Sequence, residues 1–243
     1  MKKTYGKLKL YIKNAEGEVV GRWLLNGMPP HVVIKFKHLF PKIKQSVMQP
    51  FALDNSDETC CDLEWFHSRY PFDISDGHRA MLQKRSRDYR EFVEDNLRLI
   101  SGEYTPPAVL GFKEGKALKD FQLLAVTLFN RVKRLLIADV VGLGKTVEAL
   151  GALMNPDTLP ALVVVQSHLP DQWCDKIEDF TSLSSHAVKI TKPYTLLRKD
   201  IVVVKYTNIA KWIDVLGDYG FKTMVLDEVQ EVRRIESKKH EDC

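Results

Sequence analysis

The fold of this chain is decided by residues 135–146, which read LLIADVVGLGKT. A short apolar run leads into a turn with two glycines, and residues 147–154 after it have the spacing of a helix. A Gly-Lys-Thr turn between a strand and a helix directs backbone N–H groups and the helix N-terminus at phosphate oxygens. The stretch therefore predicts a phosphate-binding loop, in which Lys145 reaches the β- and γ-phosphates and the Thr146 hydroxyl binds Mg²⁺.

This loop departs from the strict P-loop pattern at one position. The pattern has a glycine five residues before the final glycine, and this chain has Asp139 there. Gly142 and Gly144 remain where the backbone must approach phosphate closely. A purely structural turn is the alternative, and the choice between the two depends on a second motif.

The second motif is the acidic pair in residues 225–230, which read VLDEVQ. Ligands of a parallel α/β sheet bind at the carboxyl ends of its strands, so Asp227 is expected to face the loop that carries Lys145. A carboxylate in that place can hold Mg²⁺, and Glu228 can orient and deprotonate an attacking water. A charged strand end that meets solvent is the alternative, but the combination with the Gly-Lys-Thr turn favours a nucleotide site.

The apolar runs around these motifs indicate an α/β fold. They lie at Leu135–Ala138, Ala161–Val165, Ile201–Val204 and Met224–Leu226, with helical patterns between them. Strands without polar alternation that are separated by helices predict a parallel sheet covered on both faces. We assign residues 111–243 to this domain.

The first 110 residues have a different pattern. Apolar residues alternate from Tyr5 to Ile12, and an extended pattern resumes from Val19 to Leu25, which predicts a β-hairpin. A third extended run is expected at Val32–Phe36, so residues 1–50 are interpreted as a β-rich accessory unit. Residues 51–110 have helical spacing and end in a linker.

Charge is unevenly distributed between these regions. Residues 1–50 contain ten Lys and Arg against two Asp and Glu, a net charge of +8, whereas residues 51–110 have a net charge of −5. The basic segment is interpreted either as a surface that contacts phosphates or as the solvated face of a small sheet. The sequence leaves these two interpretations open.

The composition excludes several classes of protein. The chain has 243 residues, 44% of them hydrophobic and 28% charged, which is typical of a globular protein rather than a collagenous or disordered one. No stretch approaches the roughly 18 apolar residues of a membrane span, so no membrane partner is expected. The four cysteines are not spaced as metal ligands, so we expect a reduced, intracellular setting, cytoplasmic or associated with the nucleoid.

The two motifs together resemble those of a known family. A Gly-Leu-Gly-Lys-Thr loop followed by an Asp-Glu-x-Gln box is similar to helicase superfamily two, and in detail to its Swi/Snf-type ATPases that depend on double-stranded DNA. The first motif of that group begins with Asp, as at Asp139. The resemblance continues through Leu118–Gln122, Leu162–Val165, the Gln172-Trp173 pair and the strand that ends at Tyr206.

The resemblance implies an N-terminal RecA-like lobe that binds ATP and Mg²⁺, with duplex DNA as the partner. It implies that Gln122 reads the adenine, that Thr146 and Asp227 hold the Mg²⁺, and that Lys145, Asp227 and Glu228 are catalytic. The residues it places around the phosphates are Asp139, Val140, Val141, Gly142, Leu143, Gly144, Lys145 and Thr146.

The chain also departs from the family. Val140-Val141 replaces the commoner Glu-Met, Gln166 stands in place of Pro, and Gln230 in place of the His of many members. The family has a second RecA-like lobe with an arginine finger, and none follows the acidic box here. We therefore expect the N-terminal part of a longer translocase, inactive in isolation. A non-hydrolysing, nucleotide-dependent module that binds nucleic acid is the alternative function.

Overall fold

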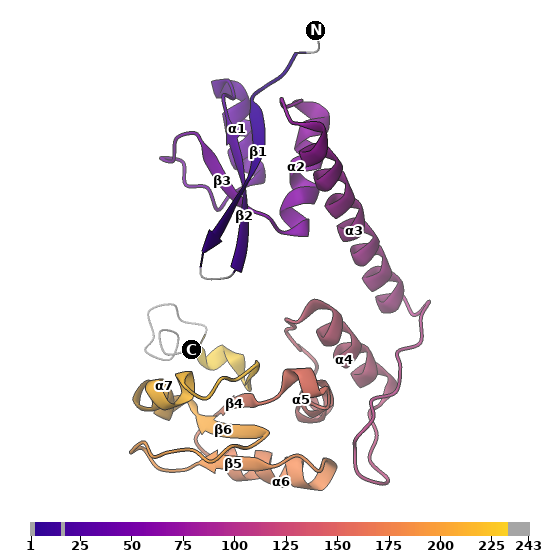
Figure 1. Cartoon of the computed structure of the whole chain (residues 1–243). Helices are drawn as coiled ribbons and strands as arrows, with labels where there is room; N and C mark the ends of the chain where they lie inside the picture. The colour runs from indigo at the N-terminus through magenta and orange to yellow at the C-terminus, as the bar shows by residue number, and fades with distance from the viewer. Residues whose placement is uncertain (1–2, 16–17, 233–243) are drawn as a thin grey trace. The chain divides into compact units, whose positions relative to one another are not determined.

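The computed structural model describes residues 3–15 and 18–232, and it divides the chain into two compact units (Figure 1). The first unit is Met1–Ser101 and the second is Gly102–Cys243. The second unit begins with residues 102–119, which contain no helix or strand, and the linker expected before residue 111 falls at the start of this segment.

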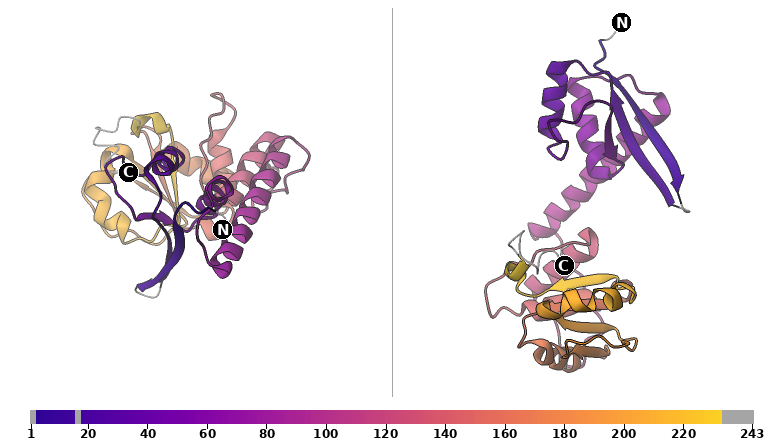
Figure 2. Two further views of the ribbon diagram at one scale, coloured as in Figure 1. Left: turned by 90° about the horizontal axis from the view of Figure 1, so that it is seen from above. Right: turned by 90° about the vertical axis from the view of Figure 1, so that its left-hand side faces the viewer.

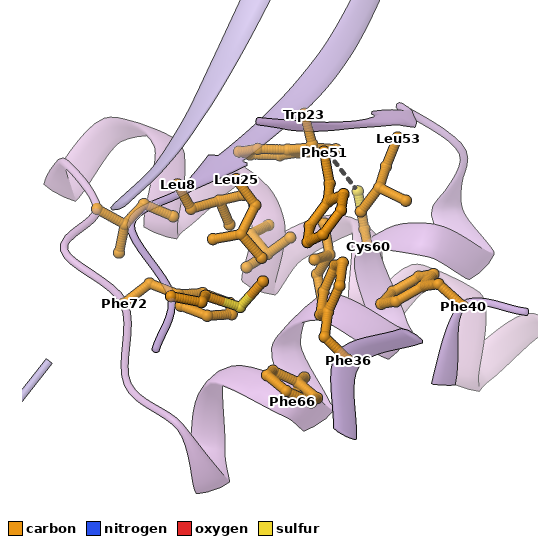
Figure 3. Packing of buried hydrophobic residues seen from close by; sticks show 14 of the residues in the cluster. Leu8, Trp23, Leu25, Phe36, Phe40, Phe51, Leu53, Cys60, Phe66 and Phe72 are labelled. Atoms are coloured by element: carbon orange, nitrogen blue, oxygen red, sulfur yellow. Dashed lines mark hydrogen bonds between the residues drawn. The ribbon is translucent and has the colours of Figure 1, made fainter. Parts of the chain in front are cut away.

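A small antiparallel sheet forms the first layer of the first unit. Strands β1 (Lys7–Ala15), β2 (Glu18–Asn26) and β3 (Phe51–Asp54) pair in the order β1-β2-β3, which confirms the hairpin expected from the alternating pattern. One end of the pair of strands β1 and β2 extends away from the helices of this unit (Figure 2, right). The inward side chains of the sheet pack on the helices in one core (Figure 3).

Residues 32–36 were expected to be extended, and this prediction is wrong. They lie in helix α1 (Pro30–Leu39), which has a proline at the start, where helices favour it. Val32, Phe36 and Phe40 recur every four residues and are all buried, so a helix places them on one face toward the sheet. The Phe36 ring lies 5.6 Å from that of Phe51 on β3 and 5.2 Å from that of Phe66.

Two helices complete this unit and confirm the helical spacing. They are α2 (Asp57–Arg69) and α3 (Asp76–Ile100). Serines cap both N-termini, since Ser56 Oγ accepts from the Thr59 N–H and Ser75 Oγ accepts from the His78 N–H. The core of the unit contains buried residues from both of the regions interpreted above, residues 1–50 and residues 51–110.

The second unit is an α/β fold, as predicted. Its parallel sheet has the order β5-β6-β4-β7. The strands are β4 (Ala161–Val165), β5 (Ser185–Val188), β6 (Ile201–Lys205) and β7 (Thr223–Leu226). The helices are α4 (Asp120–Val132), α5 (Lys145–Leu153), α6 (Pro170–Phe180) and α7 (Ile209–Gly217), with short 3₁₀ turns at Pro156–Thr158, Tyr206–Asn208 and Val229–Val232.

Helices cover both faces of this sheet. Side chains of β4 and β6 alternate between two buried clusters, one with Trp212 and Leu216 of α7 and the other with Trp173 and Ile177 of α6. This explains why these strands are apolar along their whole length. The burial of both faces is the arrangement that the apolar runs predicted.

The apolar run at residues 135–138 does not form the strand that the sequence predicted. It has no regular structure, and within the described residues β7 pairs only with β4. Leu135, Leu136 and Ile137 instead line a cavity together with residues of β7.

Candidate nucleotide-binding site

The glycines of the predicted phosphate loop have the conformation that the turn requires. Gly142 and Gly144 have φ angles of +92° and +93°, a region that other residues rarely adopt. A Cβ atom on Gly144 would lie 2.8 Å from Gln122 Nε2, so space as well as backbone geometry favours glycine there. Helix α5 begins directly after this turn, at Lys145. The turn therefore places the loop at a helix N-terminus.

Lys145 folds back over its own loop. Its ammonium donates to the backbone carbonyl of Asp139 over 2.9 Å, and the Leu143 N–H donates to the Val140 carbonyl over 3.3 Å. Val140 and Val141 are 73% and 89% exposed, so the first half of the loop lies on the surface. The two hydrogen bonds close the loop into a compact turn.

Gln122 lies beneath the loop rather than on the surface. It is buried on α4; its Oε1 accepts from the Lys119 N–H over 2.9 Å, and its Nε2 donates to the Leu143 carbonyl over 3.0 Å. The amide thus connects the start of α4 to the phosphate loop. Its reading of adenine stays a prediction.

The acidic box is held by partners from two other elements. The Trp173 indole N–H on α6 donates to Asp227 Oδ2 over 2.8 Å, and the Tyr206 hydroxyl donates to the Asp227 carbonyl over 2.8 Å. The Asp227 N–H donates to the Val164 carbonyl on β4. Asp227 therefore has a fixed backbone and one fixed carboxylate oxygen. Glu228 follows with a φ of +52° and accepts a hydrogen bond from the Gln230 amide.

One cavity brings the two motifs together. It has a volume of about 300 Å³, and Lys145 and Thr146 line it together with Asp227 and Glu228. The remaining walls are mostly apolar and come from α4, residues 135–137, α5, Trp173 of α6, β7 and residues 229–230. Gln122 and residues 139–144 do not line it. The cavity thus joins the end of the loop to the acidic box across about eighty residues of sequence.

Sequence reasoning missed a third acidic residue in this cavity, Glu148 on α5. Its side chain is fully buried, and neither carboxylate oxygen has a hydrogen-bond partner among the described residues. Burial first, and then the nearby Asp139 carboxylate, raise the pKa of Glu148 to about 7, although Lys145 opposes the shift. The signal in the sequence was a single carboxylate in the otherwise apolar stretch from Val147 to Leu150.

The residues expected to hold Mg²⁺ have the right chemistry for it. Mg²⁺ prefers oxygen ligands and usually binds through one or two protein groups plus phosphates. The Thr146 hydroxyl and the Asp227 carboxylate line the same cavity. The Trp173 indole N–H donates only to Oδ2 of Asp227, so Oδ1 is available to a cation. No cluster of three His, Cys, Asp or Glu residues suited to a metal occurs in the part of the chain that the structure describes.

None of the described helices is both long and apolar enough to cross a bilayer.

Comparisons with known proteins identify the family of this chain. The model of the SNF2-related domain matches residues 58–243. The protein "DNA annealing helicase and endonuclease ZRANB3" is 33% identical over 161 residues in Homo sapiens and 32% identical over 122 residues in Bos taurus. These matches cover 62% and 46% of this chain, but only 13% and 11% of the relatives.

A solved structure shares the fold. The Sulfolobus solfataricus SWI2/SNF2 ATPase core in complex with dsDNA matches with a TM-score of 0.51 and 19% identity, over 57% of this chain and 31% of that one.

Proposed function

The chain belongs to the SNF2-related domain family, and from this premise we propose that it forms the ATP-binding lobe of an ATPase that moves on duplex DNA. One observation supports the proposal most strongly. Lys145 and Thr146 from the loop meet Asp227 and Glu228 from the end of β7 in a single cavity.

Each of these residues has a role that follows from its chemistry. The Lys145 ammonium, released from the Asp139 carbonyl, neutralises the β- and γ-phosphates. The first turn of α5 directs backbone N–H groups toward the same phosphates. Glu228 orients the attacking water and accepts its proton.

Thr146 and Asp227 would hold Mg²⁺ in this site. When bound, the ion would neutralise charge on the phosphates as the terminal phosphoryl group is transferred. The Trp173 indole fixes Asp227 for this task through the hydrogen bond to Oδ2.

Duplex DNA and a second RecA-like lobe complete the proposal. Support for DNA comes from the solved relative, whose structure is described as a complex with dsDNA. During each cycle of ATP hydrolysis, the proposed lobe would close against a second lobe. The surface of that second lobe is not part of the described residues. The chain spans about an eighth of its curated relatives, so their whole activity is a proposal here.

Nucleotide titration tests the site. We expect the chain to bind ATP with Mg²⁺ and Lys145→Ala to abolish detectable binding, because no other lysine or arginine of the described chain lines the cavity. Lys211→Ala, which removes an exposed lysine on α7, serves as the matched control and should bind as the parent does. Calorimetry measures both, and equal affinities for the parent and Lys145→Ala would refute the assignment of the loop.

A further inference from the structure

The small sheet of the first unit has one face that its helices do not cover. Side chains alternate between the two faces of the sheet along β1 and β2. Those that point inward and pack in the core are Leu8, Leu10, Trp23 and Leu25. Lys7, Lys9, Tyr11 and Arg22 point to the opposite face, and all four are exposed. The described residues of this unit therefore leave a solvent-facing sheet surface with cations and one aromatic ring.

The strand register places three of these side chains close together. Tyr11 on β1 lies directly opposite Arg22 on β2. Lys9 lies two positions along β1, about 7 Å away on the same face. Tyr11 is 57% exposed, so its ring is open to a ligand although it stands on a regular strand. We call Lys9, Tyr11 and Arg22 the open-face triad.

The charges around the triad favour an anionic partner. Residues 3–53 contain nine Lys and Arg against two acidic residues, Glu16 and the first residue of β2, Glu18. Two further carboxylates lie close to these strands. Asp54 lies opposite Arg22 on β3 and accepts a hydrogen bond from the Thr59 hydroxyl over 2.8 Å, and Asp73 forms an ion pair with Lys7 over 3.1 Å. Lys7 is therefore left out of the triad.

We propose that the open-face triad binds single-stranded DNA, with a base stacked on Tyr11 and phosphates on Lys9 and Arg22. Aromatic rings on flat sheets stack unpaired bases, and neighbouring cations follow the backbone. A duplex keeps its bases stacked on one another, so an exposed ring has no base face to contact there. This site lies outside the nucleotide cavity and extends the proposed function, because it would let the chain hold an unpaired strand.

Fluorescence anisotropy with a labelled oligonucleotide of about 20 thymidines tests the proposal on the whole chain without ATP. Tyr11→Ala should weaken binding about 5- to 150-fold, the range for one stacked base, while Tyr11→Phe keeps the ring and should bind within about twofold. Lys9→Ala and Arg22→Ala should each reduce the slope of log affinity against log salt by about 0.7, because each removes one phosphate contact.

Two control variants make the outcome specific. Lys35→Ala removes an exposed lysine of α1, on the helix layer rather than the open face, and should leave the affinity unchanged. Lys145→Ala, which addresses the nucleotide site, should also bind the oligonucleotide normally, so failure of this inference is distinct from failure of the proposed function. The proposal is overturned if Tyr11→Ala binds as the parent does, or if Lys35→Ala costs as much as Lys9→Ala.

The affinities for other nucleic acids show which class of ligand the triad binds. Equal loss of duplex binding in Tyr11→Ala would remove the argument from stacking and overturn the single-strand assignment. Tighter binding of a uridine oligonucleotide with the same dependence on Tyr11 would assign the surface to RNA and overturn the choice of DNA.

Discussion

At the scale of single residues, Gln122 shows the largest difference between the role expected from the sequence, which is to read adenine, and the contacts that the structure shows. Its amide already connects Lys119 to the Leu143 carbonyl, so it supports the phosphate loop before any base is bound. The Gln122 Nε2 also donates to the Gly144 carbonyl over 3.5 Å, so only the Oε1 atom has capacity left, as a further acceptor, for one base edge. Support of the loop and recognition of adenine are therefore compatible at this position.

We expect Gln122→Ala to lower the affinity for ATP about 2- to 10-fold more than the affinity for GTP, the effect of one lost hydrogen bond to the base. Competition between ATP and GTP for the chain measures this difference. Gln172→Ala, an exposed residue on α6, is the control. An equal loss for both nucleotides would mean that Gln122 supports the loop and does not read the base.

Glu148 makes the stability of the lobe depend on pH. Its pKa rises from 4.5 to about 7 on folding, so the folded chain keeps a proton that the unfolded chain releases. The free energy of unfolding therefore falls as the pH rises from about 4.5 to about 7 and then stays level. Glu148→Gln removes this dependence because its amide does not ionise.

Urea denaturation at about pH 5 and about pH 8 checks this expectation. At the higher pH, Glu148→Gln should be more stable than the parent by up to about 3 kcal/mol, because each unit of the raised Glu148 pKa corresponds to about 1.4 kcal/mol, and at the lower pH the two should be close. Glu178→Gln, on the exposed side of α6, should follow the parent at both. The same difference at both pH values would contradict the shifted pKa.

At the scale of elements, apolar runs that are buried on both faces were predictable. β4 and β6 are fully buried along nearly their whole length, so burial alone explains their sequences. β5 was missed because Ser185–Val188 lies at the edge of the sheet and is only partly buried. The hydrogen bond between Trp173 and Asp227 joins residues 54 positions apart, and no local pattern indicates such a contact.

Helix α1 was mistaken for a strand because its local signal was ambiguous. Val32, Val33 and Ile34 favour strands, whereas the burial of Phe36 against Phe51 and Phe66 depends on segments far along the chain. A helix and a strand would place different residues of this segment on the buried face. A strand would put Val32, Ile34 and Phe36 on one side, but in α1 Ile34 is 58% exposed and Phe36 is buried.

This difference gives a direct test. We expect Phe36→Ala to destabilise the first unit by about 3–5 kcal/mol, as for other buried aromatic residues, and Ile34→Ala to stay within about 0.5 kcal/mol. Hydrogen–deuterium exchange of β1 and β2 in urea isolates this unit from the other. Comparable losses for both variants would indicate that the segment is a strand.

At the scale of the whole molecule, the described residues of the cavity include the proposed cation, Lys145, and the proposed base, Glu228, but not the arginine that phosphoryl transfer uses. Among the described residues that line the cavity none is an arginine. An arginine finger contributes about 10³ to 10⁵ in rate. The polypeptide of 243 residues is therefore expected to hydrolyse ATP near the background rate, even with saturating duplex DNA.

A phosphate-release assay compares this chain with a version joined to a second RecA-like lobe. The joined version should show hydrolysis stimulated by DNA, and Glu228→Gln should abolish it. Robust DNA-stimulated turnover by the chain alone, at low protein concentration, would place a catalytic arginine within it. Arg233 and Arg234 lie outside the described residues and would be the first to replace.

The edge of β7 has a practical consequence for work with this polypeptide. Its backbone donors and acceptors on one side have no ladder partner among the described strands, and Met224 and Leu136 beside it are 49% and 72% exposed. An apolar strand edge of this kind is a template for pairing between molecules, which leads to aggregation. We therefore expect residues 1–243 to self-associate as the protein concentration rises, and a fused segment that shields this edge should suppress the association.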